Sequence, residues 1–162
     1  MVTRSSLAAN VGDEDFGLVA GRTIARLAKL VEAAIAPLEL SLPQYRLLAL
    51  LVDGAAMSST LAERLTVKPP TVTAVVDGLV ARGLVTRQVD PHDRRRLPLV
   101  LTPDGTALLE HANASVGAAL VDGLGLVGDH DAHAAVDGLD AWQKVLDARR
   151  ERHAAERRAA GA

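Results

Sequence analysis

Apolar residues in the first part of the chain recur at three- and four-residue steps, which is the spacing of one face of an α-helix. This pattern predicts an amphipathic helix over about 13–36, which Pro37 ends. Shorter helices are predicted over about 43–52 and 59–65, and a fourth over 69–83. The first half of the chain is therefore predicted to be a series of four helices.

Residues that commonly cap helices stand at the ends of these segments. Ser41 with Gln44 three residues later has the spacing of a capping box, which predicts the start of the second helix. Ser58 is the expected cap of the third helix, and Gly83 fits the C-terminal cap of the fourth.

The period of the pattern then changes to that of β-structure. Residues 84–89 and 97–102 are short, β-favouring runs on either side of the polar stretch Asp-Pro-His-Asp-Arg-Arg-Arg at 90–96. They predict a β-hairpin with a charged tip, in which Pro98 suits an edge strand.

Helical patterns return after the hairpin. One helix is predicted from about Pro103 into the 120s, with a bend or break among the glycines of 117–128, and a last helix over about 131–158. The apolar stripe of the last helix is formed by Ala135, Leu139, Trp142, Val145 and Leu146. The fold class is therefore mainly α with a small β-hairpin wing (α+β).

Helix, short helix, tight connection, helix and charged hairpin follow one another in the order of a winged helix-turn-helix. A helix that begins at Pro69 fits the width of a DNA major groove, where its first residues would meet base edges. The hairpin beside it would reach phosphates or a minor groove.

Composition and charge indicate where a nucleic-acid partner could bind. The chain has 162 residues, enough for one domain, with 49% apolar residues, 23% charged residues and a formal charge of −2. Its middle third, 41–105, is net basic, with eight basic and six acidic side chains, and the charge peaks at Arg94-Arg95-Arg96. Any nucleic-acid contact is therefore expected to be local to this third.

Other classes of protein are disfavoured. No cysteine is present, which excludes disulfides and thiolate metal sites, and 2% aromatic residues argue against base-stacking platforms. The first ten residues contain no long apolar run, so we expect no secretion signal, no membrane span and a cytoplasmic location.

Several short motifs within 41–109 carry a family resemblance. They are Leu-Ala-Glu-Arg-Leu at 61–65, Pro-Thr-Val-Thr-Ala-Val-Val-Asp-Gly-Leu at 70–79, Arg-Gly-Leu-Val at 82–85, Asp-Pro-His-Asp-Arg-Arg at 90–95 and Leu-Val-Leu-Thr-Pro-Asp-Gly at 99–105. Together they resemble the multiple-antibiotic-resistance regulator (MarR) family of bacterial transcription factors. The pairing of the wing motif with Leu-Thr-x-x-Gly is the most specific part of the match.

The resemblance implies a domain organisation: a flexible tail at 1–12, a MarR-type domain at 13–150 and a charged tail at 151–162. Within that domain, 41–105 would be the DNA-binding lobe, and 13–40 and 106–150 the dimerisation helices. It also implies a homodimer on a pseudo-palindromic double-stranded DNA operator. Family members mostly repress, and many release DNA when a small aromatic or phenolic effector binds between the dimer interface and the lobe.

The residues expected to contact DNA are Ser58, Lys68, Pro70, Thr71, Thr73, Ala74, Arg94, Arg95 and Arg96. Many relatives carry a basic residue where Ala74 and Gly78 stand, whereas 69–81 contains neither Lys nor Arg. We therefore expect the wing to supply more of the phosphate contacts than this helix does. Each of these predicted DNA contacts also has a purely structural interpretation. Arg94 would stiffen the wing if it pairs with Asp90 or Asp93, the threonines would be ordinary helix residues, and Ser58 would cap a helix.

The effector candidates are Leu18, Arg22, Arg26, Tyr45 and Leu48. His111, His130 and His133 lack a suitably spaced fourth ligand, so we expect surface histidines, no metal and no cofactor. No catalytic spacing or nucleotide loop is present, so no enzyme is expected. The alternative to a ligand-responsive repressor is a winged-helix dimer that binds a protein partner and has lost tight DNA binding.

Overall fold

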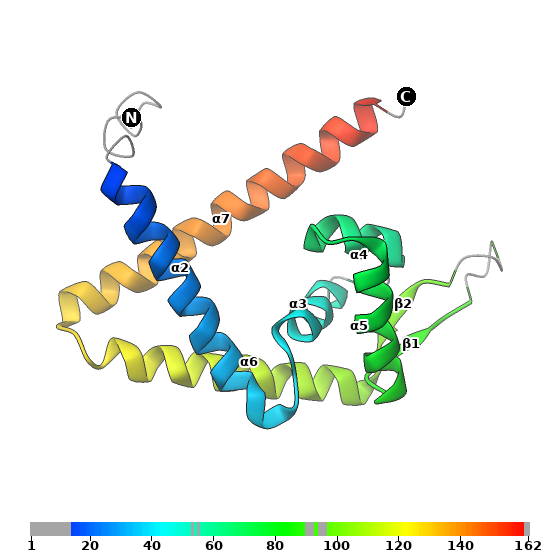
Figure 1. Ribbon diagram of the computed structural model, residues 1–162, viewed down its shortest axis with the longest axis horizontal. Coiled ribbons are helices and arrows are strands. Elements are labelled where there is room, and N and C mark those ends of the chain that lie inside the picture. Colours follow the sequence, from blue (N-terminus) through cyan, green and yellow to red (C-terminus); the bar gives the residue numbers. More distant parts are fainter. Residues whose placement is uncertain (1–13, 53, 55, 90–92, 94–96, 161–162) are drawn as a thin grey trace. The chain divides into compact units, whose positions relative to one another are not determined.

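The computed structural model describes residues 14–52, 54, 56–89, 93 and 97–160, and it is mostly helical (Figure 1). The elements in order are α2 (Glu14–Ile35), η1 (Ala36–Leu38), α3 (Leu42–Leu51), α4 (Ser58–Leu65), α5 (Pro69–Ala81), β1 (Val85–Arg87), β2 (Leu99–Leu101), α6 (Pro103–Leu124) and α7 (Asp129–Ala160). The chain divides into two compact units, residues 1–119 and residues 120–162, and each is described by itself below.

Local chemistry explains most of the helix ends. The Ser41 hydroxyl accepts from the Gln44 backbone N–H, and the Gln44 side chain accepts from the Ser41 N–H, so the predicted capping box is confirmed. Gly83 follows α5 with φ +70°, a left-handed conformation that suits glycine, which confirms the predicted end of that helix.

The predicted cap of α4 was wrong. The helix includes Ser58, and Met57 occupies the N-cap position without a side-chain hydrogen bond. Met57 has the extended backbone of an N-cap, with φ −76° and ψ 148°, so the helix starts one residue earlier than the serine pattern predicts. The Ser58 hydroxyl is therefore not used to cap this helix.

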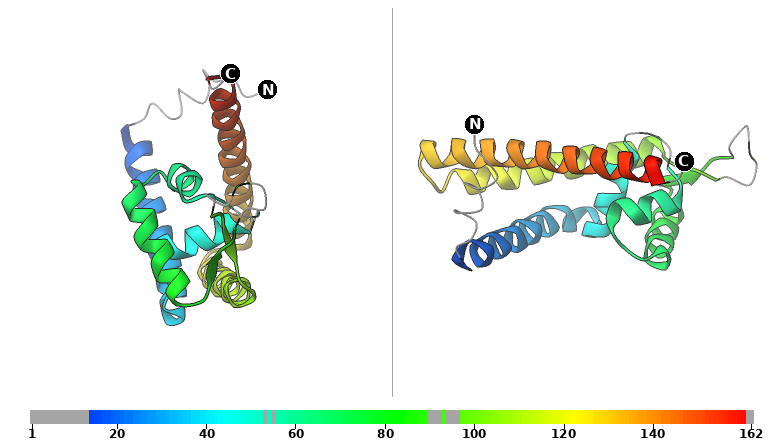
Figure 2. Two further views of the ribbon diagram at one scale, coloured as in Figure 1. Left: turned by 90° about the vertical axis from the view of Figure 1, so that its right-hand side faces the viewer. Right: turned by 90° about the horizontal axis from the view of Figure 1, so that it is seen from above.

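The core of the first unit is aliphatic and lies between the helices of the lobe and the hairpin. Buried side chains come from α3 (Leu47, Leu48, Leu51), α4 (Leu61, Leu65), α5 (Val72, Val76, Leu79) and the strands (Val85, Leu99). Figure 2 shows α3, α4, α5 and the strands gathered at one end of this unit. Burial of this apolar area fixes which face of α5 remains outside.

The hairpin is antiparallel, with Val85 opposite Leu101 and Arg87 opposite Leu99. Its strands have three residues each, shorter than the predicted runs, although the Gln88 N–H still donates to the Pro98 carbonyl at 2.9 Å. Ala56 forms a bridge to the other side of Leu99, which ties the α3–α4 connection to the wing strands. The tip of the wing lies outside the described residues.

The start of α6 packs very closely on the end of α5. The Thr102 hydroxyl accepts from the Gly105 N–H at 3.0 Å and donates to the Gly83 carbonyl at 2.7 Å. A Cβ on Gly105 would lie 2.0 Å from the Leu84 carbonyl oxygen. The Leu-Thr-x-x-Gly motif therefore joins the wing to the long helix through a contact that only glycine permits.

The break predicted among the glycines of 117–128 is confirmed at the junction of the two long helices. α6 continues through Gly117 and Gly123, and the chain breaks only between Leu124 and Asp129. α7 is one uninterrupted rod (Figure 2), and its predicted apolar stripe is largely exposed, with Trp142 60% accessible. No helix in the described part of the chain is long and apolar enough to cross a membrane.

Candidate nucleic-acid interface

The exposed side of α5 carries the residues that the sequence predicts to meet base edges. Pro70, Thr71, Thr73 and Ala74 are all exposed. The opposite side is anchored in the core, where Val72, Val76 and Leu79 are almost completely buried. Proline at the first positions of α5 also suits a helix start, because these positions have no intrahelical acceptor for an N–H.

The hydroxyls at this end of the lobe differ in what they bind. Thr73 Oγ1 donates to the Pro69 carbonyl at 3.2 Å, which leaves its lone pairs available as acceptors. Thr71 and Ser58 are exposed at the starts of α5 and α4. Hydroxyls in such positions can contact phosphate oxygens or base edges.

Three of the arginines that make the middle third basic are used inside the lobe. Arg46 Nη2 donates to the Leu65 carbonyl, and Arg64 Nη1 donates to the Leu50 carbonyl, each at 3.4 Å. Arg82 donates to the carbonyls of Leu38 and Glu39, the latter at 2.6 Å. These guanidiniums tie α3 to α4 and the end of α5 to η1.

Lys68 is exposed at the N-cap of α5, beside the predicted base-contacting residues. Arg94, Arg95 and Arg96 lie outside the described residues, as does the proposed pairing of Arg94 in the wing. The contribution of these three arginines therefore stays a prediction from the sequence.

Sequence reasoning missed one charged pair at the root of the wing. Arg87 Nη2 on β1 lies 2.6 Å from Asp77 Oδ1 on α5, and both side chains are about half exposed. The available signal was weak: Asp77 is three residues after Ala74 and four after Thr73, so it shares their helix face. The strand that brings Arg87 to this face could not be placed from spacing alone.

The effector candidates do not form one cluster. Leu18, Arg22 and Arg26 are exposed along α2, where Arg22 and Arg26 border an open hollow, whereas Leu48 is fully buried in the core. The Tyr45 hydroxyl donates to Asn113 Oδ1 at 2.8 Å and so links α3 to α6. Burial raises the pKa of this hydroxyl, so it remains a hydrogen-bond donor at neutral pH.

A small apolar hollow also lies within the lobe itself. Pro43, Arg46, Leu65, Val67, Thr71, Val72 and Val75 line it, from α3, the α4–α5 connection and α5. Its rim includes Thr71, one of the predicted DNA contacts. A molecule bound there would therefore adjoin the surface that the sequence predicts to face DNA.

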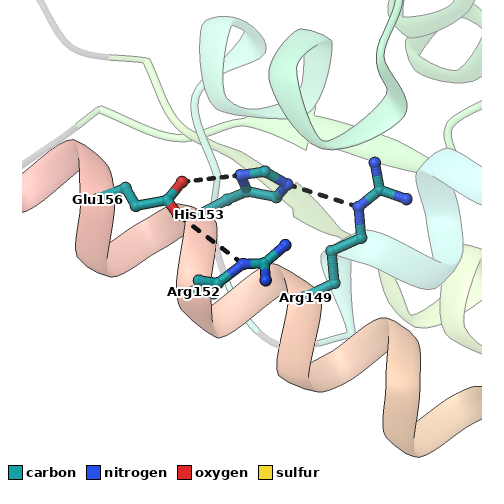
Figure 3. Close-up of polar contacts among 4 residues, drawn as sticks. All are labelled: Arg149, Arg152, His153 and Glu156. Carbon is teal, nitrogen blue, oxygen red and sulfur yellow. Dashed lines mark hydrogen bonds and ion pairs between the residues drawn. The ribbon is translucent and has the colours of Figure 1, made fainter. Parts of the chain in front are cut away.

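In the part of the chain that the structure describes, no three or more His, Asp or Glu side chains are grouped so that they could hold a metal ion. His133 Nδ1 contacts the Asp129 carbonyl within the first turns of α7. Near the other end of α7, His153 bridges Arg149 and Glu156, and Glu156 also meets Arg152 (Figure 3). All four side chains lie along one helix, so the network is a set of local pairs at spacings of three and four.

Comparisons with known proteins show which family this chain resembles in sequence. A model of the MarR family matches residues 40–97. The transcriptional repressor Rv2887 of Mycobacterium tuberculosis is 36% identical over 108 residues, which are 66% of this chain and 78% of that protein. The repressor YetL of Bacillus subtilis is 38% identical over 74 residues, 44% of each chain.

Solved structures agree with these relatives. The crystal structure of Rv2887 with salicylic acid has a TM-score of 0.65 and 31% identity over 78% of this chain and 94% of that one. CouR of Rhodococcus jostii RHA1, bound to p-coumaroyl-CoA, has a TM-score of 0.66 and 27% identity over 82% and 92%. The chain therefore belongs to the MarR family of winged-helix, DNA-binding transcriptional regulators.

Proposed function

We propose that the protein represses transcription by binding, as a symmetric dimer, an inverted double-stranded operator. The observation that carries the proposal is the outward face of α5, which presents small and hydroxyl side chains at the start of a helix whose other face is locked in the core. A helix held in this way can enter a major groove without losing its packing. The wing would contact the flanking phosphates or minor groove.

Two helices present apolar surface that a second copy would cover. On α2, Phe16, Leu18, Val19 and Ile24 are each at least 46% exposed, and on α7 five large apolar residues are exposed. Single exposed apolar residues are ordinary, but repeated ones along a helix indicate an interface. Regulators of this family act as DNA-binding dimers, and these helices are the ones that the resemblance assigns to dimerisation.

The proposed DNA contacts divide into two classes that a salt series separates. Replacing Arg94 by Ala should weaken binding to all sequences about equally and flatten the salt slope by roughly two units per dimer, because one phosphate contact per subunit is lost. Replacing Thr73 by Ala should leave the slope nearly intact and cost about 1–3 kcal/mol at one operator position. The measurement is the dissociation constant for operator variants at several salt concentrations.

Thr106→Ala serves as the matched control for the threonine. Thr106 is exposed on α6, its hydroxyl likewise donates to a carbonyl four residues earlier, and it lies away from the α5 face. It should change neither the salt slope nor the base preference. An unchanged slope in Arg94→Ala together with a reduced slope in Thr73→Ala would reverse the roles assigned here.

The effector that we propose is a small aromatic or phenolic acid. Two observations support it: the ligands of solved relatives and the side chains that this chain offers. The solved structures of Rv2887 include complexes with salicylic acid and p-aminosalicylic acid, and CouR is bound to p-coumaroyl-CoA. In this chain, Arg22 and Arg26 border one hollow and offer guanidiniums for a carboxylate, so they are the residues through which we expect an acid to act. Tyr45, whose hydroxyl donates to Asn113, is a separate candidate on α3.

A further inference from the structure

The DNA-facing side of α5 carries a negative charge. Asp77 is the one charged residue in the sequence of α5, and it is exposed on the same face as Thr73 and Ala74. A carboxylate in this place repels the phosphates that the surface is expected to approach. Its presence in a DNA-binding helix that lacks any Lys or Arg therefore needs an explanation.

The Asp77 carboxylate forms an ion pair with Arg87 on β1. Arg87 Nη2 and Asp77 Oδ1 are 2.6 Å apart, with 41% and 58% of the respective side chains exposed. An ion pair this exposed to water contributes little to stability. The pair instead fixes the position of a positive charge, because it holds the Arg87 guanidinium against α5 at the root of the wing.

Several other arginines of the lobe, Arg46, Arg64 and Arg82, already donate to backbone carbonyls within it. Among the residues that the structure describes in α5 and the wing strands, the charges are those of Asp77 and Arg87, with Lys68 just ahead of α5. Pairing with Asp77 therefore lowers the positive charge at the root of the wing, while Arg94, Arg95 and Arg96 are expected to supply the charge of its tip.

We propose that Asp77 limits the affinity of the protein for DNA, because it withholds the charge of Arg87 from the phosphates. Non-specific binding depends almost wholly on phosphate contacts and counterion release, whereas operator binding also uses base contacts. A phosphate contact contributes to both, so withholding Arg87 weakens both about equally and lowers the salt slope. The inference rests on the proposed function, since it requires that α5 faces DNA.

The test is the variant Asp77→Asn, which keeps the shape of the side chain and removes its charge. Its affinity is measured for the operator and for a scrambled duplex of equal length across a salt series. Freed from the carboxylate, Arg87 should gain about one phosphate contact per subunit, which steepens the salt slope for both duplexes by roughly two units per dimer. Affinity for both duplexes should rise about tenfold at low salt, and the ratio of the two affinities should stay nearly unchanged.

Two further variants make the result specific. Glu110→Gln makes the same change in net charge at an exposed position of α6, and its slope and its two affinities should equal those of the unmodified protein. Asp77→Asn combined with Arg87→Gln should lose the gain in affinity, because the released cation is gone. Thermal unfolding midpoints of the three variants confirm that each is folded.

Each outcome separates this inference from the proposed function. If the unmodified protein prefers its operator and Asp77→Asn leaves both affinities and the slope unchanged, the role of Asp77 is overturned while the proposed function stands. The same holds if Asp77→Asn weakens binding to both duplexes and lowers the unfolding midpoint, which indicates a purely structural pair. If the unmodified protein binds neither duplex, both the inference and the proposed function fail.

Discussion

Insertion of five base pairs between the two half-sites of the operator is expected to abolish high-affinity binding. A symmetric dimer presents two copies of α5 related by a two-fold axis, so its half-sites should lie about one helical turn, roughly 10 base pairs, apart. Half a turn of extra DNA places the second half-site on the opposite side of the duplex. One copy of α5 then loses its groove, and affinity should fall at least about 100-fold, toward non-specific binding.

The matched control inserts the same five base pairs just outside the operator. It adds equal length and equal non-specific sites, and it should leave the affinity unchanged. Gel-shift or anisotropy titrations on the three duplexes measure the effect. High affinity that survives the central insertion would contradict the two-fold docking of α5.

The second large effect is on folding stability. Replacing Gly105 by Ala should destabilise the protein by about 3 kcal/mol, because an added methyl group cannot be accommodated there. The new Cβ would lie 2.0 Å from the Leu84 carbonyl oxygen and 2.9 Å from its carbon, both backbone atoms. Relief requires α6 to move away from Leu84, which strains the bonds from Thr102 to the Leu84 and Gly83 carbonyls.

The control for this variant is Gly117→Ala, farther along the same helix. Nothing in the described chain lies within 4 Å of a Cβ at Gly117, and alanine is the better helix former, so stability should hold or rise by up to about 1 kcal/mol. Denaturant unfolding at one fixed protein concentration compares the two. Equal stability of the two variants would show that the contact between α6 and Leu84 is not tight in solution.

Local sequence signals predicted the fold well where the cause is itself local. The capping box of Ser41 and Gln44 and the left-handed Gly83 each depend on residues within three positions, so both could be seen in the sequence. The glycines of 117–128 correctly predicted a break, which lies between Leu124 and Asp129, but they did not show that α6 passes through Gly117 and Gly123. A glycine only weakens a helix, and its neighbours decide whether the helix ends there.

The charges of the candidate site could be counted from the sequence but not placed. The basic middle third predicted a local nucleic-acid surface, yet Arg46, Arg64 and Arg82 turn out to hold the lobe together. A long guanidinium side chain can reach solvent or a carbonyl from the same backbone position, so composition does not determine its direction. The Asp77–Arg87 pair joins a helix to a strand, and only the packed lobe brings the two together.

The measurement that tests the central claim most directly is protection of the DNA upstream of the protein's own reading frame, with and without salicylate. The account predicts protection of one inverted repeat whose half-sites are about 10 base pairs apart, weaker protection at higher salt, and release when the acid is added. Absence of any protected repeat at low salt and micromolar protein, on this DNA and on other promoter fragments of the same genome, would contradict it.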